Sequence, residues 1–349
     1  MMKKLICVVL AAAVLLATGI SAEAVQYRIR DLGMLGGISS TAKCINDSGQ
    51  VVGALTTSSS GDHMFLWQNG NMTDLSTLGG NRSYAMGINN SGQVVGYSYV
   101  PPYGDHAFLW QNGSRTDLGI GTAMGINDSG QIVGDSNGSG GYTHAFLWQG
   151  EGMTDLGTLG GNYSYAYGIN NSGQVVGLSF VLDGNQHAFL WQGGSMTDLG
   201  TLGRNYSNAW DINDSGQVVG QSSTSDGYNH AFLWQNGSMI DLGTLGGTGS
   251  SAWGINNSGQ LVGSSSTSSG YNHAFLWQNS SMTDLGTLGG NQSGAYGINN
   301  SGWIVGTSYD ASGKQHAVLW EPVPEPSSIL ALLCGIGSLG GVIVRRRGK

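Results

Sequence analysis

The chain has 349 residues, of which 61 are glycine and only 10% are charged, and its formal net charge at pH 7 is −8. The body from Val25 to Glu321 is more acidic, because 7 Lys and Arg stand against 19 Asp and Glu, a balance of −12. An acidic surface argues against nucleic acid or an anionic membrane as a partner. The body contains one cysteine, Cys44, and the other two lie in the N-terminal segment (Cys7) and the C-terminal segment (Cys334). No intramolecular disulfide is therefore predicted after export.

Residues 1–24 have the three parts of a secretory signal peptide. Lys3 and Lys4 precede an apolar run, Leu5–Ala17, and Ala22-Glu23-Ala24 is an A-x-A cleavage site. A retained N-terminal anchor is the alternative, but the run is short and a small-residue site follows it. No cysteine follows closely, which argues against a lipoprotein. We expect an exported protein whose mature chain begins at Val25.

A repeated unit fills residues 25–321. Its clearest part is His187-Ala-Phe-Leu-Trp191, and the gaps between neighbouring copies are 43, 38, 43, 43, 43 and 43 residues. A fixed period of this length is typical of repeat architectures. The seven histidines of the chain all belong to this unit: His63, His106, His144, His187, His230, His273 and His316.

Each copy holds four short strand-like segments separated by turn signals. In the fourth copy we expect strands at Tyr165–Asn170, Gln174–Ser179, His187–Gln192 and Ser195–Leu199. The turn Asn170-Asn-Ser-Gly173 suits a type I turn that closes on a left-handed glycine. Each unit is therefore predicted to be a four-stranded antiparallel meander, with strong hairpin signals at Asn69-Gly70, Asn112-Gly113 and Asn236-Gly237.

The phase of the repeat indicates how the units assemble. Their strands are apolar on both faces, which requires cover on both sides, as in radially stacked blades. The chain opens with a fourth strand, Tyr27–Leu32, and stops after a third strand, His316–Trp320. A ring closed by pairing these two leaves no open edge, whereas an open solenoid would need polar caps that are absent. The predicted fold is all-β: a seven-bladed β-propeller closed by an N-terminal strand.

A histidine and an aspartate come close together in every predicted unit. If Gly193-Gly194 form a two-residue turn, His187 faces Gly200, and Asp198 is its diagonal neighbour on the same face. Seven equal pairs favour a structural hydrogen bond in each copy. A single catalytic or metal site would instead require one copy to differ from the others. We expect His187 to contact Asp198 or backbone and to be largely buried, and we predict no catalytic residue, metal or cofactor.

Several copies carry an Asn-Asp-Ser-Gly turn that could suggest calcium. Each turn has at most one acid, whereas a calcium loop needs several oxygens and a bidentate carboxylate. We interpret these segments as turn chemistry: Asn46–Gly49, Asn127–Gly130 and Asn213–Gly216.

The loops between second and third strands vary most between copies. They carry aromatic residues beside Asn, Asp and Ser, and in a propeller they share a rim with the fourth-to-first connections, such as Gly160–Ser164. Such a surface suits a carbohydrate, because rings stack on sugars and amides bind hydroxyls. Unconstrained solvated loops are the alternative. The possible ligand face comprises Tyr103, Tyr228 and Tyr271.

The last segment, residues 322–349, lies outside the repeats. It holds a Pro-Glu-Pro motif, a 17-residue apolar segment at 328–344 and an arginine cluster. The apolar segment is at the short end of a transmembrane helix, and the cluster would stop its transfer and hold that end in the cytoplasm. The motif residues are Val323, Pro324, Glu325 and Pro326, and the stop-transfer residues are Arg345, Arg346 and Arg347.

This three-part order resembles the PEP-CTERM sorting signal of Gram-negative bacteria. The resemblance implies that an exosortase removes the tail, so that the protein crosses the inner membrane transiently through 328–344 and then reaches the cell surface or the exterior. A permanent transmembrane anchor is the alternative, but it has no need of Pro-Glu-Pro beside it.

The repeated His-Ala-Phe-Leu-Trp, Asp-Leu-Gly and Gly-Ile-Asn-Asn-Ser-Gly-Gln segments resemble the HAF family of extracellular repeats over residues 27–321. Some copies depart from the pattern, notably Trp210-Asp-Ile-Asn where others have Gly. The resemblance supports architecture and location, and no activity carries over with it. We expect a non-enzymatic interaction or biofilm-matrix protein, with exopolysaccharide as a possible partner. The alternative is a polysaccharide lyase or hydrolase that uses the non-repeated charges Lys314, Arg204, Arg115, Arg82, Asp183 and Asp226.

Overall fold

A computed structural model describes residues 26–323, apart from 59–60, 76, 78–79, 138–140 and 151. The described residues form 28 β-strands. Among them, no helix has the length and apolarity needed to cross a membrane. The predicted signal peptide and the predicted sorting signal beyond Val323 lie outside the described residues.

The strands repeat in groups of four along the chain. The first strands of the groups are β2 (Ser39–Ile45), β6 (Ser83–Ile88), β10 (Thr122–Ile126), β14 (Gly160–Ile169), β18 (Gly203–Ile212), β22 (Gly246–Ile255) and β26 (Gly289–Ile298). The second strands are β3 (Val51–Thr57), β7 (Val94–Val100), β11 (Ile132–Asn137), β15 (Val175–Val181), β19 (Val218–Thr224), β23 (Leu261–Thr267) and β27 (Ile304–Asp310).

The third and fourth strands follow in each group and form its outer half. The third strands are β4 (Gly61–Gln68), β8 (Gly104–Gln111), β12 (Thr143–Gln149), β16 (Gln186–Gln192), β20 (Asn229–Gln235), β24 (Asn272–Gln278) and β28 (Gln315–Val323). The fourth strands are β5 (Asn71–Asp74), β9 (Ser114–Ile120), β13 (Gly152–Asp155), β17 (Ser195–Asp198), β21 (Ser238–Asp241), β25 (Ser281–Asp284) and β1 (Gln26–Gly33).

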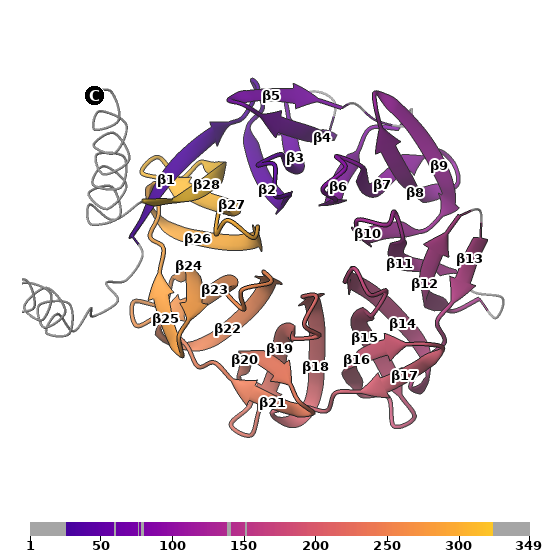
Figure 1. Cartoon of the computed structure of the whole chain (residues 1–349). Helices are drawn as coiled ribbons and strands as arrows, with labels where there is room; N and C mark the ends of the chain where they lie inside the picture. The colour runs from indigo at the N-terminus through magenta and orange to yellow at the C-terminus, as the bar shows by residue number, and fades with distance from the viewer. Residues whose placement is uncertain are drawn as a thin grey trace, which may run out of the picture. The chain divides into compact units, whose positions relative to one another are not determined.

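The sheets are antiparallel meanders arranged radially around a common centre (Figure 1), and the fold is an all-β propeller. A cavity lined by residues of all seven copies opens at this centre, and we call it the channel. Five sheets have four strands, and one has eight, formed by β14–β17 and β18–β21, which are joined by a single parallel pair between Gln186 and Tyr206. The propeller is the compact unit Ile29–Glu321. Strand β1 pairs with β28, so the predicted pairing of the N-terminal strand with the last third strand is confirmed.

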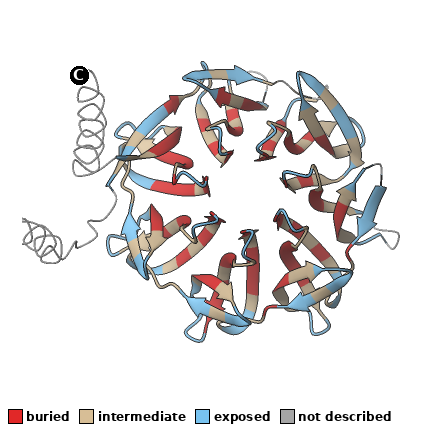
Figure 2. Cartoon of the chain, viewed as in Figure 1, coloured by how far each residue is buried: buried red, intermediate tan, exposed pale blue. Residues whose placement is uncertain are grey.

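The core lies between neighbouring groups of strands. Figure 2 shows the inner strands largely buried and the outer strands largely exposed. In one interface Ala209, Val218 and Phe232 of the fifth copy pack against Val176 and Ala188 of the fourth copy. Because each strand is apolar on both faces, the same packing recurs from copy to copy, and one cluster also joins the last copy to the first.

The predicted strands of the fourth copy are present, but their limits differ by one to five residues, and two of these differences change a loop or a pairing. The first strand of the fourth copy begins at Gly160 rather than Tyr165, so Gly160–Ser164 is part of β14 rather than a loop. Its register with β15 is irregular there, which accommodates the extra residues. The fourth strand ends at Asp198, and His187 therefore does not pair with Gly200.

The predicted turns are confirmed. Asn69, Asn112 and Asn236 have φ of 51–52°, the left-handed conformation that two-residue hairpins need. In the turn after β2, the Gly49 N–H donates to the Asn46 carbonyl at 3.0 Å, and Gly49 has φ of 76°.

Candidate functional site

The seven histidines lie beside aspartates, as the predicted register requires. In every copy a histidine Nδ1 lies 2.7–2.9 Å from an aspartate oxygen, and the distance from His187 to Asp198 is 2.7 Å. The His187 side chain is 20% exposed and that of Asp198 is 40% exposed. The other oxygen of Asp198 accepts the Gly200 N–H at 2.7 Å. The structural role of the pair remains our interpretation.

The predicted ligand face carries exposed tyrosines, but they are spread over several copies. Tyr103, Tyr228 and Tyr271 are 68%, 49% and 43% exposed, in the second, fifth and sixth copies. Tyr228 lines a groove of about 390 Å³ together with Asn229, Thr248, Ser251, Ser264, Ser266 and Asn272. The structure therefore places one of the three tyrosines in a groove walled by hydroxyl and amide groups.

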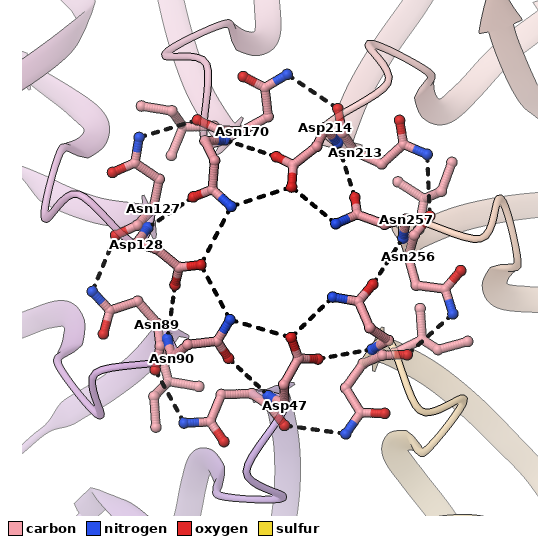
Figure 3. Close-up of a pocket in the computed structure, with 18 of the residues that line it drawn as sticks. Asp47, Asn89, Asn90, Asn127, Asp128, Asn170, Asn213, Asp214, Asn256 and Asn257 are labelled. Carbon is pink, nitrogen blue, oxygen red and sulfur yellow. Dashed lines mark hydrogen bonds between the residues drawn. The ribbon is translucent and has the colours of Figure 1, made fainter.

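A feature not predicted from the sequence is an asparagine ring at one mouth of the channel (Figure 3). The first asparagine of each turn is buried, and in six of the seven copies its side-chain N–H₂ group donates two hydrogen bonds. The Asn170 side-chain N–H₂ donates to Gln174 Oε1 at 2.6 Å and to the Asn213 carbonyl of the next copy at 3.1 Å. Its oxygen accepts the backbone N–H groups of Ser172 and Gln174. The Asn299 amide donates to the Asn46 carbonyl at 3.1 Å, which joins the last copy to the first.

The second residue of each turn is exposed and belongs to a second ring at the same mouth, which lies nearer the centre in Figure 3; we call it the outer ring because it faces solvent. Each Asn in it donates to its neighbouring aspartates: Asn171, for example, donates to Asp128 at 3.3 Å and to Asp214 at 3.2 Å. With an odd number of copies, strict alternation of Asp and Asn is impossible, and the break falls at Asn257 beside Asn300. Two carboxylates are therefore never neighbours, which avoids their repulsion. The outer ring is Asp47, Asn90, Asp128, Asn171, Asp214, Asn257 and Asn300.

The outer ring predicts an unequal response to two equal substitutions. Asn171→Asp should lower the free energy of unfolding by about 1–2 kcal/mol, because it removes two donated hydrogen bonds and places three carboxylates in a row. Asn257→Asp should cost about half as much, because Asn257 has one aspartate neighbour, Asp214. Urea unfolding would measure the loss of unfolding free energy in both variants. Because salt screens the repulsion between carboxylates, 0.5 M NaCl should reduce the difference between the two losses. Equal losses at low salt would contradict this explanation of the alternation.

A third set of side chains narrows the channel beyond the asparagine ring, and we call it the channel pocket. It has a volume of about 300 Å³, and its walls come from one residue of each first strand. Asp211, the residue that replaces glycine in the fifth copy, lines the adjoining space, where Cys44 also lies. The channel pocket comprises Lys43, Met86, Met124, Tyr167, Trp210, Trp253 and Tyr296.

Asp211 is held by two backbone groups. Its carboxylate accepts the N–H of Ile212 at 2.8 Å and, from the next copy, the N–H of Ile255 at 3.0 Å. Burial raises the pKa of Asp211 to about 7, and these two bonds offset only part of the increase. Among the described residues, no cluster of three or more His, Cys, Asp or Glu could hold a metal ion.

No protein-family model and no curated protein matches the sequence. Solved propellers do resemble the structure. The β-propeller domain of the Trilobed protease from Pyrococcus furiosus, described as having an open velcro topology, is 10% identical with a TM-score of 0.58 and covers 81% of this chain and 96% of its own. YCF48 bound to D1 peptide is 10% identical with a TM-score of 0.53, covering 87% and 97%. At these identities the likeness shows the fold.

Proposed function

We propose that this chain is an exported, non-enzymatic, seven-bladed propeller that acts as an interaction or matrix protein at the cell surface and binds exopolysaccharide. Support for the number of blades comes from the eight-stranded sheet, whose halves share only the pair Gln186–Tyr206 and so count as two blades. One blade then corresponds to each copy of the HAF-like repeat.

The route to the surface rests on the two ends of the sequence. A signal peptide at 1–24 would direct export, and the PEP-CTERM-like tail at 322–349 would be processed by an exosortase after transient insertion in the inner membrane. The expected location of the protein is therefore the surface or the extracellular matrix of a Gram-negative cell. An acidic body that makes no disulfide suits this role, since its stability comes from packing.

The observation that carries the binding proposal is the groove at Tyr228. An exposed aromatic ring beside hydroxyl and amide groups offers a stacking face and hydrogen bonds, the two contacts that a sugar ring makes. A non-enzymatic role is supported by the non-repeated charges, which are spread over several copies. Arg82, for example, is paired with Asp105 of its own copy at 3.2 Å.

Binding of full-length protein, purified in mild detergent, to exopolysaccharide from its host tests this proposal. We expect saturable co-sedimentation, and Tyr228→Ala should weaken it about tenfold by removing the stacking face. Ile240→Ala is the matched control, because Ile240 is 41% exposed in the same copy but lies on the outer strand β21. Absence of binding by the folded wild type, or an equal loss in both variants, would overturn the proposal.

A further inference from the structure

Each first strand carries a one-residue bulge, and the bulged residue is the one that enters the channel pocket. In β18 the register with β19 jumps between Ala209 and Asp211, which leaves Trp210 unpaired. The other six first strands have the same jump at the equivalent position. A bulge re-aims a side chain and is often found beside functional sites. Here seven bulges aim seven side chains at one axis.

The bulged residues differ between copies, whereas the residue before each of them does not. The residue before each bulged residue is a fully buried alanine in every copy. The first asparagine of the turn lies three residues after the bulged residue. Copies four to seven place four aromatic residues side by side, with ring centroids 4.6 Å apart for Tyr167 and Trp210 and 4.8 Å apart for Trp253 and Tyr296. A pocket of about 300 Å³ is at the lower end of small-ligand sites. It suits a chain end rather than a long polymer.

One donor on this wall is unused. The Trp210 Nε1 atom is buried and has no hydrogen-bond partner within the described residues. A buried indole N–H normally finds an acceptor. Because this atom has almost no accessible surface, the part of Trp210 that a ligand could contact is its ring. The adjoining Tyr167 hydroxyl is held by the side chain of Asn208, whose own oxygen is also unpartnered.

The channel pocket also presents a cation without an anion. Lys43 Nζ lies 4.3 Å from the centroid of the Tyr296 ring, and none of the ion pairs in the described part of the chain includes Lys43. Burial lowers the pKa of Lys43. An ammonium group removed from water is costly unless a negative group accompanies it, and Asp211 already binds two backbone N–H groups. A carboxylate on a ligand would supply the missing partner.

We propose that the channel pocket binds an acidic sugar, a hexuronate at a glycan chain end. The ring would stack on the aromatic side chains of copies four to seven, and its carboxylate would meet Lys43. This inference rests on the proposed function, which supplies the class of ligand, a polysaccharide. It adds a second binding site and a preference for a negatively charged sugar, neither of which follows from the groove at Tyr228.

Calorimetric titration of full-length protein in mild detergent tests the site, with a galacturonate trisaccharide and neutral maltotriose as probes. The wild type should bind the acidic probe more tightly. Lys43→Met should weaken the acidic probe about tenfold or more and leave the neutral probe within about twofold, because a charged hydrogen bond is lost. Trp210→Phe should weaken both probes about three- to tenfold. Lys314→Met, the same change at an exposed position, should match the wild type.

The outcomes separate this inference from the proposed function. If Lys43→Met and Lys314→Met behave alike, or if no trisaccharide binds while exopolysaccharide still co-sediments, the channel site is wrong and the proposed function stands. If the acidic probe binds through Lys43 but exopolysaccharide does not co-sediment, the channel site stands and the proposed function fails. Thermal unfolding of each variant confirms that it is folded, so loss of binding reports on the pocket.

Discussion

A Gly220→Ala variant should lose about 3 kcal/mol or more of unfolding free energy. Gly220 lies in β19, opposite Ala209 of β18 and Phe232 of β20. An added methyl group would come within 1.9 Å of the Asn208 carbonyl oxygen and 2.8 Å of the Phe232 ring. Neither atom belongs to a flexible side-chain end, so the strands themselves would have to separate. Urea unfolding followed by tryptophan fluorescence measures the loss.

The control for this substitution is Gly152→Ala. The nearest atom to a methyl group there is the Gln149 carbonyl oxygen at 3.9 Å, and Gly152 begins the exposed outer strand β13. Its unfolding midpoint should stay close to that of the wild type, within about 0.5 kcal/mol. Similar midpoints for the two variants would contradict the close strand approach. The same approach, at 1.8–2.0 Å, recurs at Gly53, Gly96, Gly134, Gly177, Gly263 and Gly306.

The features set by local pattern were predictable from the sequence. Strand side chains alternate, and a two-residue turn fixes the register of a hairpin, so the contact between His187 and Asp198 followed from their spacing. The pairing of β1 with β28 followed from the phase of the repeat, because a spare fourth strand at one end matched a missing one at the other. In both cases neighbours along one sheet decide the geometry.

The features that form only where all seven copies meet at the channel were not predicted from the sequence. The turn beginning at Asn46 looks like isolated turn chemistry in one copy, and its bonds to the next copy exist only because equivalent turns meet at the channel. Alternation of Asp and Asn at the second turn position was the signal that could have revealed the outer ring. The channel pocket was missed because a bulge cannot be seen in the period-two pattern, although the variable residue before Gly-Ile-Asn marked its place.

The wild type should become less stable relative to Asp211→Asn as pH rises from about 4 to about 7. Asp211 has a pKa of about 7 in the folded protein, against an ordinary value of 3.8. Between these values the folded state keeps a proton that the unfolded state has released, so the free energy of unfolding falls with rising pH and levels off above 7. The loss should be about 2–4 kcal/mol. Urea unfolding at several pH values gives the two curves.

Comparing the two curves isolates Asp211, because every other titrating group is common to both proteins. Cys44, its neighbour in the channel, has a pKa raised by burial and stays neutral over this range. Asp211→Gly, which restores the residue found at this position in five other copies, should show the same flattened pH dependence, even if its absolute stability differs. Parallel curves for wild type and Asp211→Asn between pH 4 and 7 would mean that water reaches the carboxylate freely. The channel wall beside the pocket would then be wet, and the unpaired Lys43 ammonium would lose its need for an anionic ligand.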